Sequence, residues 1–434
     1  MLPVEILKKK RDGLELSKKE IIFFIQGIIS SYISDVQAAA FLTSSYINGL
    51  TAKEIAYLTF AMRDSGEIFE FPDINKPIID KHSTGGVGDK ISLLLVPILM
   101  SCDIAVPMIS GKGLGHTGGT VDKLESVVGY NMHLPKEKLK ELLYQNGAFM
   151  TAQTDEIAPA DKIHYDIRDI TGNVDSNGLI AASILCKKLA EGLDGLVLDM
   201  KVGNGAFMRN FTDAKLLADT MAAVARESGL KMQIIFSAME QPLGYTVGNW
   251  LEIEETIQAL EGNFSDDIRE LTLTLAAAMI QLGYNNLSRD EALDQAKEVW
   301  DSGLALKNFN KMISAQGGDI ESSQKKYQNT PNQEIKAKQN GFIAQIDTLY
   351  VGVAGIILGA GRRNTDDIID HSAGIRIFKK TGDNVKKGET IAIVYGQDKY
   401  RFGDAIDLLQ NCFVISEKDV ATHHKLIIDE LKIK

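Results

Sequence analysis

The first 66 residues carry apolar positions at helical intervals, separated by polar residues that can cap helices. Residues 17–20 and 51–54 each have the Ser/Thr-x-x-Glu spacing of a capping box, and each precedes an amphipathic stretch. The run 35–47 predicts a further helix, which Asn48 and Gly49 would end. The chain therefore opens with an all-helical unit.

From Pro77 onward the pattern changes to short apolar runs, each followed by a glycine-rich turn. Such runs lie at residues 78–80, 104–109 and 195–202. Their alternation with helical stretches is typical of βαβ units around a parallel sheet. Residues 161–190 interrupt this alternation with helix formers, so we expect the chain to return there to the helical unit.

A polar linker at 328–333 leads into a third type of pattern. Residues 341–346 and 381–389 predict β-hairpins, with turns rich in Gly and Asp. The second segment resembles the turn of lipoyl and biotinyl carrier domains. No Met-Lys-Met or Asp-Lys-Ala segment supplies the lysine that such carriers modify, so this part does not predict a carrier function.

Composition narrows the class of protein. The chain has 434 residues, 44% of them hydrophobic, which is more than one ordinary core needs. A net charge of −11 argues against a nucleic-acid or anionic-membrane partner. The cysteines are isolated in the sequence, at Cys102, Cys186 and Cys412, so neither a disulfide framework nor a zinc site is indicated and a reducing, cytoplasmic location fits best.

Two segments could suggest a membrane or a secretory signal. The basic N-terminus lacks an apolar stretch behind it, so we do not expect a secretory signal. Residues 91–110 are strongly apolar but contain Pro97, Asp103 and Pro107. A buried helix followed by a strand explains them better than a membrane span.

Two glycine-rich turns, at 81–90 and 110–120, carry the strongest functional signal. Glycines let backbone N–H groups approach an anion closely, and interleaved Lys, Ser and Thr side chains add hydrogen bonds. A helix beginning near Asp89 would point its N-terminus at the same place. The expected anion ligands are Lys81, Ser83, Ser92, Ser110 and Thr120.

The second turn also offers an alternative interpretation. Gly113, Gly115 and Gly118 form a G-x-G-x-x-G pattern after a predicted strand, as in dinucleotide-binding folds. The acidic residue expected at the end of a following strand is missing, and no Walker A pattern exists in the chain. A nicotinamide-dependent oxidoreductase therefore stays a remote alternative, and a single phosphate is the better candidate anion.

A third group of residues is ambiguous by spacing alone. Tyr165 and Arg168 share one helix face, and Ser183 and Lys187 share another. Their spacing fits solvent-exposed positions at least as well as a site, and the charged residues Lys188 and Glu191 nearby fit the same interpretation.

Taken together, the residues resemble the thymidine and pyrimidine-nucleoside phosphorylases. The resemblance covers essentially the whole chain, and the matching segments occur in order. They are residues 8–13, 81–89, 113–125, 158–162 and 205–208. The resemblance implies a homodimeric enzyme that cleaves a pyrimidine nucleoside with inorganic phosphate, giving the free base and a pentose 1-phosphate.

The implied fold class is α/β. A small all-α domain (1–66 and 161–192) would face a larger α/β domain (67–160 and 193–330) with a mixed, mainly parallel sheet. A C-terminal α+β subdomain with lipoyl-like hairpins would follow at 335–434. The cleft between the first two domains would close on the substrates.

The resemblance also assigns roles. Phosphate ligands fall on Lys81, Ser83, Ser92, Ser110 and Thr120, and pyrimidine contacts fall on Tyr165, Arg168, Ser183 and Lys187. Arg168 and Lys187 would stabilise the charge that develops on the departing base, and His82 would hydrogen-bond to its O2 edge or protonate it. No covalent intermediate is needed, so inversion at C1′ is expected, with phosphate as co-substrate and no further cofactor.

Two departures bear on specificity and on potassium. The broad-specificity branch, as the resemblance implies, binds potassium near Gly88, Leu243, position 246 and Glu255, with a hydroxyl at position 90. This chain has Lys90 and Thr246 there, so we expect the Lys90 ammonium to replace the cation by pairing with Glu255.

Substrate preference follows from a second comparison of branches. Residues 107–110, with Met108, resemble the thymidine-selective branch, whereas residues 241–245 resemble the broad one. We expect thymidine to be preferred, with deoxyuridine also accepted; equal use of uridine is the alternative. A phosphoribosyltransferase of related fold is a more remote rival, because the acidic pair that would hold its magnesium is not evident.

Overall fold

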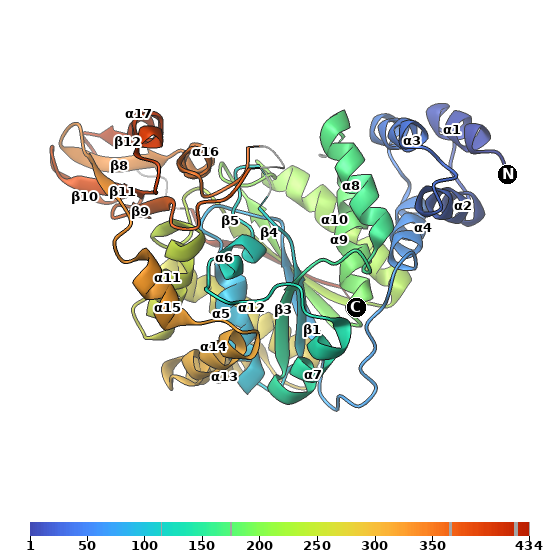
Figure 1. Cartoon of the computed structure of the whole chain (residues 1–434), viewed down its shortest axis with the longest axis horizontal. Helices are drawn as coiled ribbons and strands as arrows, with labels where there is room; N and C mark the ends of the chain where they lie inside the picture. Colours follow the sequence, from blue (N-terminus) through green and yellow to red (C-terminus); the bar gives the residue numbers. More distant parts are fainter. Residues whose placement is uncertain (114, 174–175, 364–366, 421–423, 434) are drawn as a thin grey trace.

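A computed structural model describes the chain except for residues 114, 174–175, 364–366, 421–423 and 434. In this part of the chain an all-helical unit, a central α/β unit and a C-terminal unit lie side by side (Figure 1). The N-terminus lies at the outer edge of the helical unit, whereas the C-terminus returns to the centre of the molecule.

Two distant segments build the helical unit. Helix α9 packs on α4, and α8 packs on α3. The expected capping boxes are present: the backbone N–H of Glu20 donates to Ser17 Oγ, and that of Glu54 donates to Thr51 Oγ1. The helices are α1 (Pro3–Arg11), α2 (Lys18–Ile29), α3 (Asp35–Asn48), α4 (Ala52–Arg63), α8 (Pro159–Thr171) and α9 (Asn177–Ala190).

The central sheet is mixed and mainly parallel, in the order β1-β4-β5-β13. Its first three strands are parallel and the last is antiparallel. A parallel pair, β2-β3, lies beside β1 through the bridge between Ile78 and Ala105. The strands are β1 (Ile79–Ser83), β2 (Val106–Ser110), β3 (Ala148–Ala152), β4 (Gly195–Val202), β5 (Lys231–Ala238) and β13 (Ile427–Ile433).

Helices surround this sheet. The apolar segment 91–110 forms a buried helix and a strand, α5 and β2, as expected. Within the described residues, no helix combines the length and the apolar character needed to cross a bilayer. The helices are α5 (Ile91–Ser101), α6 (Thr120–Glu125), α7 (Lys136–Asn146), α10 (Phe211–Ser228), α11 (Asn249–Leu260), α12 (Asp266–Gly283), α13 (Arg289–Asp301), α14 (Leu304–Ala315) and α15 (Ile320–Tyr327).

The C-terminal unit contains two small sheets, in the orders β10-β8-β12 and β6-β9-β11-β7. Two helices cover them, α16 (Thr348–Leu358) and α17 (Phe402–Cys412), the second preceded by a 3-10 turn at Lys399–Arg401. The strands are β6 (Thr246–Gly248), β7 (Asn332–Lys336), β8 (Gly341–Ile346), β9 (Gly374–Ile377), β10 (Asn384–Val385), β11 (Thr390–Tyr395) and β12 (Phe413–Ser416).

Two details of this unit differ from expectation. Neither residues 341–346 nor residues 381–389 form a local hairpin, because β8 pairs with the distant β10 and β12. The expected boundaries at 335 and 434 also shift: β7 begins at Asn332, and β13 leaves the unit to pair with β5. The physical reason for the second shift is that β5 would otherwise present an unpaired edge to solvent.

A buried histidine on α8 makes stability depend on pH. The pKa of His164 is lowered to about 4, and burial is the main cause of this shift. The unfolded chain takes up this proton near pH 6.5 and the folded chain does not, so stability is lost as pH falls below 6.5. We expect this residue to account for about 3 kcal/mol of lost unfolding free energy between pH 6.5 and 4. Urea unfolding of wild type and His164→Gln across this range checks it: equal losses in both proteins would contradict the assignment.

Candidate active site

The first glycine turn lies at the carboxyl end of β1, where ligands bind in open α/β sheets. Lys81 and Ser83 belong to β1, and Ser92 lies in the first turn of α5. The Lys81 Nζ is 3.4 Å from Ser92 Oγ. The Ser83 hydroxyl donates to Asp89 Oδ2 at 2.6 Å and accepts from the Gly85 N–H at 3.2 Å. The structure therefore brings the first three predicted anion ligands to one place.

The second turn connects β2 to α6 beside the first. Ser110 ends β2 and Thr120 begins α6, and the Val121 N–H donates to the Gly111 carbonyl at 3.3 Å. A Cβ added to Gly85 would lie only 3.4 Å from Thr117 Oγ1, so the two turns are in contact. Leu114, within the G-x-G-x-x-G pattern, lies outside the described residues.

Buried lysines and carboxylates form an ion-pair network at this corner of the sheet. Lys81 Nζ lies 3.7 Å from Asp199, which also pairs with Lys201. Burial acts to raise the pKa of Asp89, but Lys201, Lys81 and Lys123 outweigh it and keep this pKa below its usual range. Asp89 is therefore ionised and accepts from Ser83, while Asp199 pairs with Lys81 and Lys201.

The helical unit contributes the second group of predicted residues. Arg168 on α8 is buried, donating through Nε to the Asn173 carbonyl at 3.1 Å and through Nη1 to the Leu179 carbonyl at 3.3 Å. Ser183 on α9 is also buried, and its Oγ lies 3.1 Å from Lys187 Nζ. The surface interpretation is therefore wrong for Arg168 and Ser183.

Lys187 and Tyr165 complete this group and are half-buried. Lys187 Nζ pairs with the buried carboxylate of Asp161 on α8, which fixes the ammonium between the two helices. Burial, followed by the charge of Asp169, raises the pKa of Tyr165 to about 12, so its hydroxyl stays protonated.

His82 lies on β1, between Lys81 and Ser83 in the sequence. Burial, followed by the charges of Lys188, Lys187 and Lys81, lowers the pKa of His82 well below its ordinary value. The positive charges of lysines from both the helical and the α/β unit therefore act on its imidazole. At neutral pH it is uncharged, so it can donate a hydrogen bond but is not a reservoir of an acidic proton.

Lys90 occupies the position singled out for potassium. Its Nζ lies 2.8 Å from Glu255 Oε2 and donates to the carbonyls of Leu243 at 2.9 Å and Thr246 at 3.2 Å. Burial acts to raise the pKa of Glu255, but Lys90 and Thr246 more than offset it and lower this pKa. A Cβ at Gly88 would lie 2.5 Å from the Leu243 carbonyl oxygen, so the backbone closes tightly here.

Sequence analysis missed a buried ion cluster beside the site. Lys188 and Glu191, interpreted as charged surface neighbours, are almost fully buried and contact Asp80 of β1 and Ile109 of β2. The available signal was Asp80 itself, a charged residue directly after the apolar pair at 78–79 in a predicted strand.

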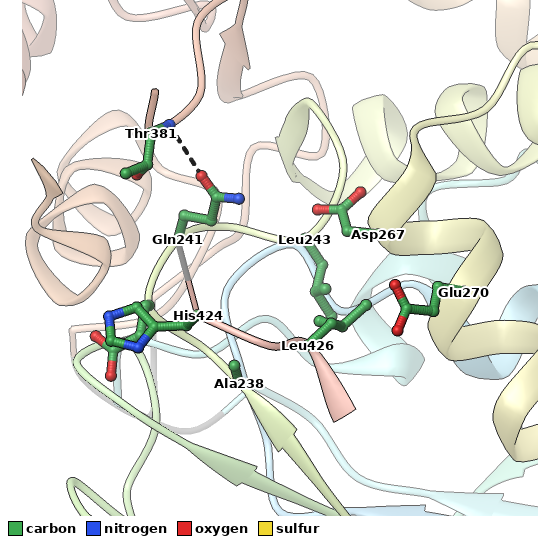
Figure 2. Close-up of a pocket in the computed structure, with 9 residues that line it drawn as sticks. Ala238, Gln241, Leu243, Asp267, Glu270, Thr381, His424 and Leu426 are labelled. Atoms are coloured by element: carbon green, nitrogen blue, oxygen red, sulfur yellow. Dashed lines mark hydrogen bonds between the residues drawn. The ribbon is translucent and has the colours of Figure 1, made fainter. Parts of the chain in front are cut away.

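A separate pocket of about 190 Å³ lies between the central and C-terminal units (Figure 2). Its lining includes the carboxylates of Glu240, Asp267 and Glu270, and the Thr381 N–H donates to Gln241 Oε1 at 3.1 Å. The acidic lining disfavours an anion, and none of the predicted phosphate ligands lies there. A groove of about 550 Å³ lies between α2 and α4, and none of the predicted phosphate ligands lines it either.

Among the described residues, no cluster of three or more His, Cys, Asp or Glu side chains is arranged to bind a metal.

Comparison with known proteins assigns the family. Residues 75–306 match the α/β domain of the glycosyl transferase family, residues 4–66 match the helical bundle domain of that family, and residues 342–416 match the pyrimidine nucleoside phosphorylase C-terminal domain. A pyrimidine-nucleoside phosphorylase from Staphylococcus epidermidis is 41% identical, covering 99% of this chain and 100% of that protein. A thymidine phosphorylase from Mesorhizobium japonicum is 43% identical, covering 92% of each chain.

The chain belongs to the thymidine and pyrimidine-nucleoside phosphorylase family. Membership makes it an enzyme, a glycosyltransferase of the pentosyl-transferring class. Among solved structures, anthranilate phosphoribosyltransferase from Thermus thermophilus matches with a TM-score of 0.59 at 19% identity, covering 72% of this chain and 99% of that one. At this identity the likeness concerns the fold alone, and it confirms the α/β class.

Proposed function

We propose that the enzyme cleaves thymidine with inorganic phosphate, giving thymine and deoxyribose 1-phosphate. The observation that carries this proposal is the position of His82, which follows Lys81 on β1 and lies close enough to Lys187 and Lys188 of α9 for their charges to lower its pKa. A nucleoside phosphorylase needs an anion site and a base site on either side of one glycosidic bond. The two groups of residues supply both.

Phosphate binds at the two turns, to Lys81, Ser83, Ser92, Ser110 and Thr120. The support is the convergence of the first three side chains and the contact between the turns. Backbone N–H groups at the start of α5 add to the attraction for an anion. Positioned there, phosphate attacks C1′ from the face opposite the base, which inverts the configuration at that carbon.

The pyrimidine binds to Tyr165, Arg168, Ser183 and Lys187. As the glycosidic bond breaks, negative charge develops on the base, and Arg168 and Lys187 stabilise it. Each such preorganised donor contributes about 3 kcal/mol to transition-state stabilisation. His82 is neutral, so it donates a hydrogen bond to the O2 edge rather than a full proton.

The helical and α/β units close on the substrates. Three connectors join the units, at residues 64–78, 153–158 and 191–194. Two of them contain a residue in the left-handed region, Ala158 with φ 47° and Gly192 with φ 70°. Connectors of this kind absorb the backbone rotation of domain closure.

Thymidine is the preferred nucleoside, with deoxyuridine accepted. The support is Met108 of β2, which is buried in the apolar core where the broad branch, by resemblance, has a lysine. The curated relatives carry both kinds of name, so rates must decide between thymidine preference and equal use of uridine.

The enzyme needs no potassium, because the Lys90 ammonium takes its place. The two carbonyls and the Glu255 carboxylate around Lys90 Nζ are the kind of oxygen ligands that a bound cation would use. Wild type should therefore show the same kcat and melting temperature in sodium and in potassium.

Lys90→Ser should make the enzyme depend on potassium. The substitution leaves Glu255 and two carbonyls facing an empty volume, which a potassium ion can fill. We expect a lower melting temperature in sodium that potassium restores, together with kcat. Differential scanning calorimetry and the thymidine assay in each salt measure both. Potassium activation of wild type, or no response of Lys90→Ser, would contradict the replacement.

The enzyme acts as a homodimer through the outer face of the helical unit. Exposed apolar side chains lie on α1, α3 and α8, which pack side by side: Val4, Val36, Ile47 and Ile170. Val36 and Ile47 are three helical turns apart and so share one face of α3. A second copy would bury these side chains, and the mass in sedimentation equilibrium tests the dimer: a monomer at micromolar concentration would rule it out.

The assay that tests the proposed function compares nucleosides. Purified enzyme is incubated with thymidine, deoxyuridine and uridine, each with and without phosphate. We expect base release only with phosphate, fastest from thymidine. Equal rates with uridine would place the enzyme in the broad branch, and release from none would refute the proposal.

A further inference from the structure

Lys188 joins three elements from both sides of the site. Its Nζ lies 2.6 Å from Asp80 Oδ2 on β1, 2.7 Å from Glu191 Oε1 after α9, and 3.0 Å from the Ile109 carbonyl on β2. Glu191 Oε1 also accepts from the Ile109 N–H at 3.1 Å. Lys188 and both carboxylates are almost fully buried.

The cluster holds two buried carboxylates but only one lysine. Asp80 Oδ1 and Glu191 Oε2 are buried and have no donor among the described residues. Burial raises the pKa of Glu191 well above its usual range, and the nearby Asp80 raises it further, although Lys188 acts in the opposite direction. A proton shared between these two unpartnered oxygens would satisfy both and would leave Glu191 neutral. The cluster then has one cation and one anion, and its buried charges balance.

Three members of the cluster are adjacent in sequence to residues of the site. Asp80 precedes Lys81 and His82 on β1, and Ile109 precedes Ser110 on β2. Lys188 follows Lys187 on α9. A shift of Lys188 relative to Asp80 would therefore displace the base-binding helix relative to the phosphate-binding strands.

We propose that Lys188 is a positioning residue, which keeps the base side of the site in register with the phosphate side through its bonds to Asp80, Glu191 and Ile109. This inference rests on the proposed function. The cluster lies next to Gly192, in one of the connectors proposed to absorb the rotation of closure. It can thus persist while the two units move.

A lysine with this role contributes to kcat rather than to phosphate binding. All proposed phosphate ligands lie on the α/β unit, so phosphate binds whether or not the base side of the site is in register with the phosphate side. Transfer needs C1′ and the phosphate oxygen in line, and a displacement of about 1 Å can cost about 100-fold in rate. In Lys188→Met we expect kcat about 100-fold lower, with the dissociation constant for phosphate within threefold of wild type.

Lys10→Met is the matched control. Lys10 is another buried lysine, 2.9 Å from the buried Glu54, but within the helical unit alone. Both substitutions leave a buried carboxylate without its cation and should lower stability. Only Lys188→Met should lower kcat at a temperature where both proteins are folded.

The neutral form of Glu191 provides a second test that does not depend on Lys188→Met folding. A glutamine can accept from Lys188 and Ile109 through its carbonyl and donate to Asp80 through its amide. Glu191→Gln should keep kcat within threefold, whereas Glu191→Leu should lose activity as Lys188→Met does.

Steady-state kinetics with thymidine and calorimetric titration of phosphate measure these effects. If the wild type is active, equal kcat values in Lys188→Met and Lys10→Met would overturn the proposal. A loss of kcat in Glu191→Gln as large as that in Glu191→Leu would also overturn it. An inactive wild type would instead refute the proposed function.

Discussion

Replacing Lys187 with alanine should lower kcat/KM for thymidine about 150-fold, the equivalent of the about 3 kcal/mol that one preorganised donor to a developing negative charge contributes. The ammonium is placed by Asp161 on one helix and Ser183 on its own helix, so no rearrangement is needed as the base departs. Phosphate binding should be unchanged, because Lys187 belongs to the helical unit.

Lys162→Ala is the control for this variant. Lys162 is an exposed lysine on α8, paired with Asp155 at 2.6 Å, and it lies outside the proposed site. Steady-state kinetics should give it wild-type values. A Lys187→Ala enzyme with wild-type kcat/KM would remove this residue from the reaction.

Replacing Lys81 with methionine should raise the dissociation constant for phosphate at least about 100-fold, the equivalent of a lost charge-assisted bond of about 3 kcal/mol. Asp199 stays paired with Lys201 in this variant, so the core is not left with an isolated charge. Thymidine binding in the absence of phosphate should change little.

The control here is Lys76→Ala, which removes a cation just before β1, at the end opposite the phosphate turns. Calorimetric titration with phosphate should give it the wild-type constant. If Lys81→Met bound phosphate normally, the glycine turns would not be the phosphate site.

Local patterns predicted much of the fold, because their causes lie within a few residues. The strand at 195–202 was predicted with its observed ends, and both capping boxes formed as expected. The pairing of β10 with β8 and of β13 with β5 could not be predicted, because strand pairing depends on partners far away in the chain.

The same distinction applies to the site. The anion turns were evident because Gly, Lys and Ser lie together in sequence. Arg168 and Lys187 became interpretable only through the family resemblance, since helical spacing does not reveal burial. Lys188 was missed because its partner Asp80 lies 108 residues away.

Phosphorus NMR of the wild-type enzyme with thymidine and inorganic phosphate tests the central claim most directly. The account predicts that the phosphate signal falls in step with thymine release, while a single signal of the α-anomer of deoxyribose 1-phosphate grows. Thymine release without loss of the phosphate signal would mean hydrolysis and would contradict it.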